Sequence, residues 1–366
     1  SPGCEHAGKV LLRPLEVPYP LIESFWTEEY EQDETLVFSM DESWFKTLDT
    51  IPKESAHKGS QGRVVLIAGS ERYPGAAILA AEAAQQAGAG YVELVAPKAV
   101  CHLALEHRPE LIIHDRAKAT AEDLDLGRDN TAVILGPGMA DLSELQLWYE
   151  KCISQSPRLV LDAGVFDLLA RMKRDKNTEE SADPANNPWL EQRPETFPEP
   201  ILTPHPGEFR RLFGDLGPRM EAVQKAANCS QCTVLLKGSR TLICSAKQKR
   251  LEVNLSGNRG LATAGSGDVL AGIIGALYAQ AAVHKKELAD PVSAASMGAY
   301  LHGAAADYAS HKMGPDGLTP SYLLKAISPI LRQLRQTKPS KTQPTKRKVA
   351  RLNEHAKKQI EHRFVR

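Results

Sequence analysis

The 366-residue sequence has no uninterrupted apolar run close to the length of about 20 residues that crosses a bilayer. It also has no excess of either charge, because 45 Lys and Arg side chains balance 45 Asp and Glu side chains. Overall charge therefore gives no reason to expect a membrane or a nucleic acid as a partner. The sequence opens with neither Met nor a signal-peptide pattern. We therefore expect a cytoplasmic protein whose sequence begins within a longer gene product or after processing.

Cysteine is scarce, and the six cysteines are not spaced as in a disulfide framework. Cys229 and Cys232 form the only close pair in the sequence, without a second pair or histidines at the spacing that a zinc site needs. We therefore expect reduced, structural thiols, and neither a metal site nor a redox site at this pair.

Changes in composition divide the sequence into parts. Residues 1–57 are irregular and acidic, with one short predicted strand at 6–12, and form an N-terminal extension. Residues 58–336 carry the regular patterns of one α/β domain, within which residues 173–200 are rich in charge, Asn and Pro and are predicted to be a surface insertion. Residues 337–366 are basic and poor in apolar side chains. They favour a disordered, solvated tail over a nucleic-acid-binding segment, because no groove-reading motif accompanies them.

Short, continuous apolar runs recur between helical patterns in the domain. They lack the alternation of a strand that faces water on one side, which indicates strands buried on both faces of a mostly parallel sheet. The order of strands and helices predicts a three-layer α/β fold, a central sheet flanked by helices. The predicted strands are 63–68, 91–96, 111–113, 132–135, 159–161, 233–236, 241–244 and 251–255, the last two as antiparallel neighbours; predicted helices include 75–88, 142–153, 291–308 and 321–336.

The segment 258–277 is the feature around which the rest of the sequence is organised. Its first half is rich in glycine, and its second half has the pattern of a buried helix. At the junction, the run Gly265-Ser266-Gly267-Asp268 lets the backbone approach a ligand closely, while the free N–H groups and the dipole of the helix favour an anion. With Asp268 as a proton acceptor, the junction is suited to phosphoryl transfer onto a hydroxyl group. The alternative is an ordinary loop in which Asp268 favours the helix start.

Further residues suited to a ligand site follow the predicted strands. Because ligands of open α/β sheets bind beyond the carboxyl ends of the strands, we expect these residues at one edge of the sheet. Each could be a simple turn or an isolated polar residue, but five such coincidences favour a site. They are Gly69-Ser70, Gly136-Pro137-Gly138, Asp162-Ala163-Gly164, Thr203-Pro204-His205 and Lys237-Gly238.

These motifs resemble the NAD(P)H-hydrate dehydratases, a family of the ribokinase-like superfamily. The resemblance covers residues 58–335 and implies a ribokinase-like fold and an ADP- or ATP-dependent repair reaction with Mg²⁺. In that reaction, the S-epimer of hydrated NADH or NADPH is phosphorylated on its ring hydroxyl, and phosphate then leaves. The similar segments, in the order of the family, are Lys58 to Ala76, Gly136 to Gly138, Leu202 to Glu208, Leu236 to Thr241 and Gly257 to Gly272.

The resemblance also implies roles for individual residues. Asp268 accepts the hydroxyl proton, and the amides from Gly265 to Gly267 stabilise the transferred phosphoryl group. Glu208 is a candidate for organising Mg²⁺ through water; its alternative role is that of a carboxylate at a helix start. The implied contacts to the hydrated dinucleotide are Ala76, Gly136, Gly138, His205 and Asp268, and those to the adenine nucleotide are Lys237, Gly238, Ser239, Arg240, Thr241 and Gly267.

The sequence departs from the family at Gly164, where relatives carry a second acid, and this leaves the role of Asp162 open. Residues 3–22 resemble, more weakly, the last strand of the epimerase domain that precedes many relatives, which implies an epimerase domain or partner. The family also implies a homo-oligomer. Two other functions stay open: a ribokinase-like kinase for a vitamin precursor or sugar, and a non-catalytic module that binds nucleotide or nucleic acid.

Overall fold

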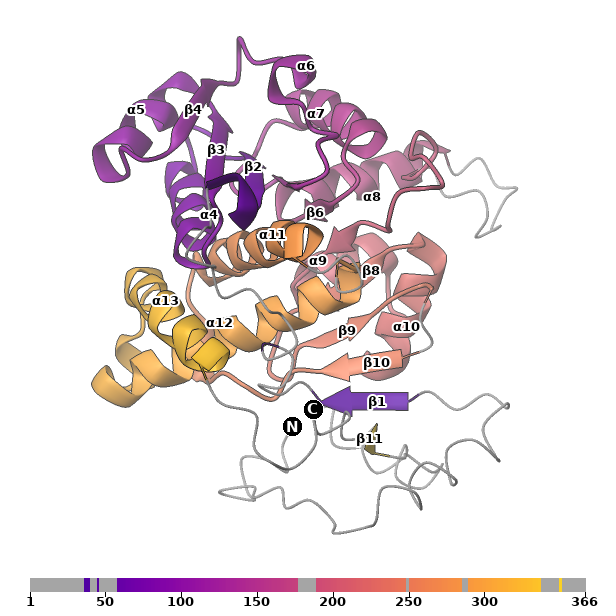
Figure 1. Ribbon diagram of the computed structural model, residues 1–366. Helices are drawn as coiled ribbons and strands as arrows, with labels where there is room; N and C mark the ends of the chain where they lie inside the picture. The colour runs from indigo at the N-terminus through magenta and orange to yellow at the C-terminus, as the bar shows by residue number, and fades with distance from the viewer. Residues whose placement is uncertain are drawn as a thin grey trace.

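The computed structural model describes residues 36–39, 45, 58–176, 189–247, 250–284, 289–336 and 349–350. In this part of the chain, strands form one sheet in the order β11-β1-β10-β9-β8-β7-β6-β5-β2-β3-β4, with β4 at one edge and β11 at the other (Figure 1). The strands are β1 Leu36–Ser39, β2 Arg63–Ile67, β3 Tyr91–Ala96, β4 Ile112–Asp115, β5 Thr131–Leu135, β6 Leu159–Leu161, β7 Ile201–Leu202, β8 Thr233–Leu236, β9 Leu242–Cys244, β10 Arg250–Val253 and β11 Val349–Ala350.

The strands from β4 to β8 form the parallel centre of the sheet. Every neighbouring pair in the order β4-β3-β2-β5-β6-β7-β8 is parallel. β9 is antiparallel to both β8 and β10, so the predicted antiparallel neighbours are confirmed. The chain runs outward from β2 to β4 and then returns to place β5 beside β2. In doubly wound sheets, ligands bind beyond the carboxyl ends of the strands at such a reversal of strand order, which here lies between β2 and β5.

Both faces of the sheet are buried, which explains why the strands lack alternation. In β2, Val64 and Leu66 belong to one hydrophobic cluster, while Val65 and Ile67 belong to the cluster on the opposite face. The predicted three-layer architecture is thereby confirmed. One face is covered by α4 Pro74–Gln86, α5 Lys98–His107, α11 Ser266–His284, α12 Pro291–Met313 and α13 Pro320–Gln336, and the other by α6 Ala121–Leu124, α7 Leu142–Gln155, α8 Gly164–Lys176, α9 Pro206–Phe213 and α10 Arg219–Ser230.

Helix α11 is the central helix of its layer, in contact with α4, α12 and β5 (Figure 1). Small residues allow this close approach: a Cβ on Gly272 would lie 2.2 Å from the carbonyl oxygen of Ala80, and one on Gly275 would lie 2.5 Å from Ile134 Cδ1. Among the described helices, it alone is long and apolar enough to cross a membrane, although the sequence showed no uninterrupted run of that length. Because 78% of its apolar window is buried inside the protein, packing in the core accounts for its composition.

Two expectations about irregular segments change. Within residues 1–57, β1 pairs in parallel with β10 and the Phe45 side chain is buried in the core, so the extension contributes to the domain; the predicted strand at 6–12 lies outside the described residues. Within 173–200, helix α8 continues to Lys176, and Trp189 and Glu199 are each only 5% exposed. Trp189 is tied to the domain because its Nε1 donates a hydrogen bond to the Leu169 carbonyl on α8. Lys173, Arg174, Glu191 and Glu195 are exposed, as expected of a surface segment.

Candidate active site

Five neighbouring parallel strands bring the candidate residues to one edge of the sheet, as the sequence predicted. In the sheet order β8-β7-β6-β5-β2, the strands end just before Lys237, Thr203, Asp162, Gly136 and Ala68-Gly69. Backbone hydrogen bonds also join the loops: the Gly69 N–H donates to the Pro137 carbonyl at 2.7 Å. The candidate site therefore lies beyond these carboxyl ends, at the reversal of strand order between β2 and β5.

Lys237 connects the ends of three strands. Its Nζ donates to Asp162 Oδ1 at 3.0 Å, and Thr203 Oγ1 donates to the same oxygen at 2.6 Å. Glu208 Oε2 lies 3.9 Å from this ammonium group. Burial opposes the charge on Lys237, but the Asp162 and Glu208 carboxylates outweigh it and raise the pKa of Lys237 above its ordinary value. Lys237 is thus a fixed positive charge inside the site.

The same ammonium group lies against the start of α11. A Cβ on Gly267 would come within 3.3 Å of Lys237 Nζ, so glycine leaves the approach open. The first turn of α11 is held from α12, where His302 Nε2–H donates to the Ser266 carbonyl at 2.9 Å. Burial lowers the pKa of His302 to about 4, so the ring is neutral at physiological pH. The positive end of the helix dipole and one lysine therefore lie at the same place, although the Ser266 N–H itself donates to the Thr263 carbonyl at 3.3 Å.

Asp268 is in the first turn of α11 and is half-buried. Burial, followed by the neighbouring Asp162 charge, raises the pKa of Asp268 to about 7, while Lys237 acts in the opposite direction. A carboxyl group with a pKa near physiological pH is well suited to take a proton from a hydroxyl group. Asp268 therefore has the proton affinity that suits the general base predicted for this position.

His205 and Glu208 organise the start of α9. His205 Nδ1 accepts hydrogen bonds from the N–H groups of Gly207 and Glu208 at 3.0 and 3.2 Å, and Glu208 Oε2 accepts from the His205 N–H at 2.8 Å. This capping box shows the helix-start role that the sequence left open for Glu208. Burial raises the pKa of Glu208 to about 7, and burial together with the Lys237 charge lowers the pKa of His205.

The carboxylate oxygens of Asp162 and Glu208 near Lys237 are compatible with a Mg²⁺ ion held through water. That Glu208 holds this ion stays a prediction. Burial disfavours the negative charge of Glu208, and Lys237 compensates for only part of this cost, so a cation beside the carboxylate would be favourable. Among the residues that the structure describes, no group of three or more His, Cys, Asp and Glu side chains could hold a metal ion. Mg²⁺ needs no such group, because it usually keeps several waters and takes only one or two carboxylates.

Glycines at two strand ends are required by the backbone. Gly136 has φ +118°, and a Cβ there would lie 2.0 Å from the Asp162 carbonyl oxygen. A Cβ on Gly164 would lie 2.3 Å from the Met139 carbonyl oxygen. This contact explains the departure from the family pattern, since a second acid at position 164 has no room beside Met139. Asp162 keeps its own role as the partner of Lys237.

The chain after β8 forms a tight loop that is held from α10. Gly238 has φ +147° and Arg240 has φ +62°. The guanidinium group of Arg219 donates from Nη1 to the Ser239 carbonyl at 3.0 Å and from Nη2 to the Arg240 carbonyl at 3.4 Å. Thr241 Oγ1 closes the loop with a bond to the Gly238 carbonyl at 3.2 Å. The predicted nucleotide contacts from Lys237 to Thr241 are therefore one ordered unit.

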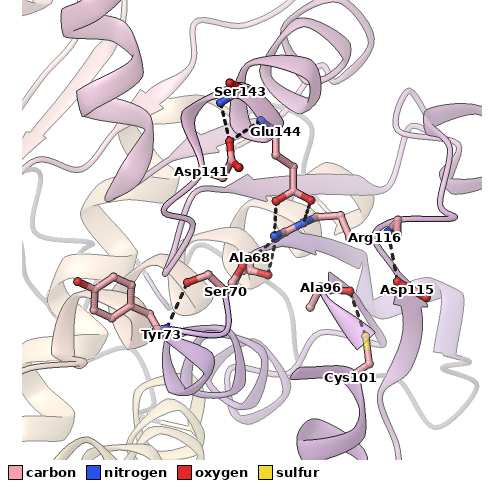
Figure 2. A network of polar contacts seen from close by, with 12 residues as sticks. Ala68, Ser70, Tyr73, Ala96, Cys101, Asp115, Arg116, Asp141, Ser143 and Glu144 are labelled. Carbon is pink, nitrogen blue, oxygen red and sulfur yellow. Dashed lines mark hydrogen bonds and ion pairs between the residues drawn. The ribbon is translucent and has the colours of Figure 1, made fainter. Parts of the chain in front are cut away.

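A buried arginine supports the loop after β2. Arg116 Nη1 donates to the carbonyls of Ala68 and Gly69 at 3.0 and 2.9 Å, while its Nε and Nη2 pair with both carboxylate oxygens of Glu144 (Figure 2). In the same view, the Tyr73 N–H donates to Ser70 Oγ at 3.2 Å. The network fixes the approach to α4 and hence the position of Ala76.

The structure brings most of the predicted residues into one neighbourhood. A Cβ on Gly138 would lie 2.8 Å from Ala76 Cβ, and Gly267 faces Lys237. Asp162, His205, Glu208 and Asp268 all act electrostatically on one another or on Lys237. Gly265 has φ +89° and packs against Leu79 of α4. Ser239 and Arg240 lie in the Arg219 loop, and no contact described here joins them to Asp268.

Sequence reasoning did not identify Arg116, Arg219 or His302. Arg116 and His302 carry no local signal, because their partners are carbonyl groups far away in the sequence. Arg219 is the first residue of α10, where the helix dipole disfavours a cation, but only the structure shows where that helix begins.

Comparison with known proteins agrees with this geometry. The family model described as NAD(P)H-hydrate dehydratase matches residues 64–329. The chain is 36% identical over 293 residues to the ADP-dependent (S)-NAD(P)H-hydrate dehydratase of Neisseria meningitidis, covering 77% of this chain and 88% of that protein. It is 30% identical over 355 residues to the bifunctional NAD(P)H-hydrate repair enzyme Nnr of Thermofilum pendens, covering 92% of this chain and 60% of that protein. The chain thus spans about 50–60% of the length of the bifunctional relatives that it matches.

Among solved structures, the ADP/ATP-dependent NAD(P)H-hydrate dehydratase from Bacillus subtilis, co-crystallised with ATP and Mg²⁺, superposes with a TM-score of 0.66 at 26% identity. The match covers 82% of this chain and all of that one. Ribokinase-like proteins share the architecture, so the ribokinase-like fold expected from the sequence is confirmed. The chain belongs to the NAD(P)H-hydrate dehydratase family.

Proposed function

We propose that the chain catalyses the adenine-nucleotide-dependent dehydration of the S-epimer of hydrated NADH or NADPH, which regenerates the reduced dinucleotide. The observation that carries the proposal is the Asp268 carboxyl group, with a pKa of about 7, in the first turn of α11, where Lys237 Nζ faces Gly267. The activity named for the Neisseria and Bacillus relatives supports it.

In the first step, the oxygen of the ring hydroxyl forms a bond to the terminal phosphorus of ADP or ATP, and Asp268 accepts the hydroxyl proton. The bond from that phosphorus to the nucleotide's leaving oxygen breaks, and AMP or ADP is released. Lys237 and the N–H groups from Gly265 to Gly267 stabilise the negative charge on the transferred phosphoryl group. Asp162 keeps Lys237 in place through their 3.0 Å contact.

In the second step, the carbon–oxygen bond of the phosphorylated ring breaks, and its electron pair leaves with phosphate. The ring nitrogen supplies electrons for this departure, and the adjacent ring carbon then loses a proton to the departing phosphate or to water, which restores the double bond. Hydroxide is a poor leaving group and phosphate is a good one, which is the chemical reason for spending a nucleotide. Asp268 has already taken the hydroxyl proton in the first step, so the protein's task in the second step is to hold the ring among Ala76, Gly138 and His205.

Mg²⁺ is proposed to accompany the nucleotide, as it does in the Bacillus co-crystals. When bound, it would neutralise phosphate charge. Glu208 would hold it through water, because one oxygen of Glu208 already caps α9.

The test is incubation of purified protein with hydrated NADH, Mg²⁺ and ADP or ATP. Recovery of absorbance in the reduced-nicotinamide band, with equimolar phosphate release, supports dehydration. A stable phosphorylated product without phosphate release would instead identify a small-molecule kinase. No nucleotide-dependent reaction with hydrated NADH or NADPH would refute the proposal.

The remaining sequence expectations are proposals of the same kind. An NAD(P)H-hydrate epimerase, as a domain or as a separate partner, would supply the S-epimer; the bifunctional relatives support this coupling. A homo-oligomer and a cytoplasmic location complete the proposal. Sedimentation and fractionation, respectively, test them.

A further inference from the structure

The loop that follows β8 is built around the guanidinium group of Arg219. Nη1 and Nη2 donate to the carbonyls of Ser239 and Arg240. A Cβ on Gly238 would lie 3.1 Å from Nη2, so the loop passes close to the arginine. Arg240 adopts the left-handed φ of +62°, which costs energy in a residue other than glycine. The backbone shape from Gly238 to Arg240 therefore depends on one side chain from another helix.

Arg219 is unfavourably placed for the stability of its own helix. It is the first residue of α10, at the positive end of the helix dipole. Burial lowers the pKa of Arg219, and its Nε has no hydrogen-bond acceptor among the described residues. The first-turn carboxylate of Glu221 pairs with Lys225. A residue that departs from these local rules at the edge of a site marks a functional demand.

We propose that Arg219 is a positioning residue for the adenine nucleotide, a proposal that rests on the nucleotide-dependent function proposed above. By binding two carbonyl oxygens, Arg219 keeps their negative ends away from the phosphates and fixes the loop that begins at Lys237. The guanidinium charge behind the loop adds to the attraction for a nucleoside di- or triphosphate. Arg219 therefore acts through the Lys237–Thr241 backbone and has no direct part in the dehydration chemistry.

The experiment measures ADP and ATP binding by calorimetry with Mg²⁺, in the absence of dinucleotide. Arg219→Met removes both hydrogen bonds and the charge, while Arg219→Lys keeps the charge but lacks the two guanidinium nitrogens that donate to the two carbonyls. Lys225→Met is the matched control, because it removes an exposed cation from the same helix. We expect Arg219→Met to raise the Kd for ADP about tenfold or more, given the strength of hydrogen bonds to charged groups. Arg219→Lys should lie between wild type and Arg219→Met, and Lys225→Met should stay within about twofold of wild type.

Kinetics then separate positioning from a general structural role. We expect Arg219→Met to raise KM for the nucleotide, while KM for hydrated NADH and kcat at saturating nucleotide stay within about twofold. A folded Arg219→Met variant that binds ADP like wild type would overturn the inference. So would equal weakening of both substrates together with a lower melting temperature. If Arg219→Met does not fold, Arg219→Lys decides by the same criteria.

The calorimetric measurement keeps this inference separate from the proposed function. Wild-type protein that binds ADP but does not dehydrate hydrated NADH would refute the proposed reaction, and the role of Arg219 would still be decided by the variants. Wild-type protein that binds neither ADP nor ATP would overturn the role of Arg219.

Discussion

Replacing Asp268 with Asn should greatly slow turnover and, at alkaline pH, stabilise the fold. The folded pKa of Asp268 is raised from 3.8 to about 7 by burial and by Asp162. Its favourable contribution to stability is thus complete below pH 3.8 and is lost as pH rises through about 7. Above that pH, the wild-type protein carries the cost of a partly desolvated charge, which a neutral asparagine side chain avoids.

The rise in pKa sets the size of the effect. Taken at face value, it corresponds to roughly 4 kcal/mol at pH 8. Asp268 keeps some contact with solvent, which screens the charge. We therefore expect Asp268→Asn to gain about 1–3 kcal/mol at pH 8, visible as a rise of about 2–6 °C in melting temperature for a domain of this size. The gain should shrink steadily towards pH 5 and vanish near pH 4.

The assay combines melting curves of ligand-free protein from pH 5 to 8 with turnover of hydrated NADH. Loss of the general base should lower kcat about 10²- to 10⁴-fold. Asp316→Asn is the matched control, because this side chain is 81% exposed and should change neither stability nor rate. An Asp268→Asn protein that is no more stable than wild type at pH 8 would show that the carboxylate is not desolvated. An undiminished rate would show that another group takes the proton.

Three further changes test other parts of the site. Below pH 7, kcat/KM for hydrated NADH should fall about tenfold per pH unit as Asp268 is protonated. Because the Asp162 charge raises the pKa of Asp268, Asp162→Asn should move this fall in kcat/KM to lower pH. A pH-independent kcat/KM would contradict the role of Asp268 as general base. Gly164→Asp should lose about 2–3 kcal/mol in denaturant unfolding, since its Cβ would meet the Met139 carbonyl at 2.3 Å, and a neutral result would exclude this steric explanation. Arg116→Met should lose about 2–4 kcal/mol and raise KM for hydrated NADH more than for nucleotide, because the loop after β2 loses its support; equal changes in both KM values would point to global damage.

The positions of most central strands followed from the sequence, because strands buried on both faces need continuous apolar residues. β3, β6 and β8 fall on the predicted residues, and β9 and β10 lie antiparallel as expected. The bounds of helix α10 were not predicted. Its buried face consists of Ala222, Val223, Ala226, Ala227 and Ser230, and such small side chains leave little hydrophobic periodicity to detect. β1 was also missed, since it is defined by pairing with β10, more than 200 residues away.

The sequence predicted which motifs meet at the candidate site, but not the tertiary contacts between their side chains. Parallel strands end at one edge, so motifs that follow them must meet there, whatever the length of the intervening helices. The ion pair between Lys237 and Asp162, which are 75 residues apart, has no counterpart in local sequence. The same holds for the His302 bond to the start of α11. The reason for Gly164 also became visible only with the Met139 carbonyl in place.

The charges of the site favour a nucleotide that arrives with its cation. When Asp162, Glu208 and Asp268 are all ionised, their charge exceeds that of the single Lys237 ammonium group. Two of these carboxyl groups, Glu208 and Asp268, have pKa values of about 7, because burial and mutual repulsion resist full ionisation. A bare polyphosphate would increase this repulsion, and Mg²⁺ bound with the nucleotide would offset part of that increase. We therefore expect the nucleotide to bind more tightly with Mg²⁺ than without it.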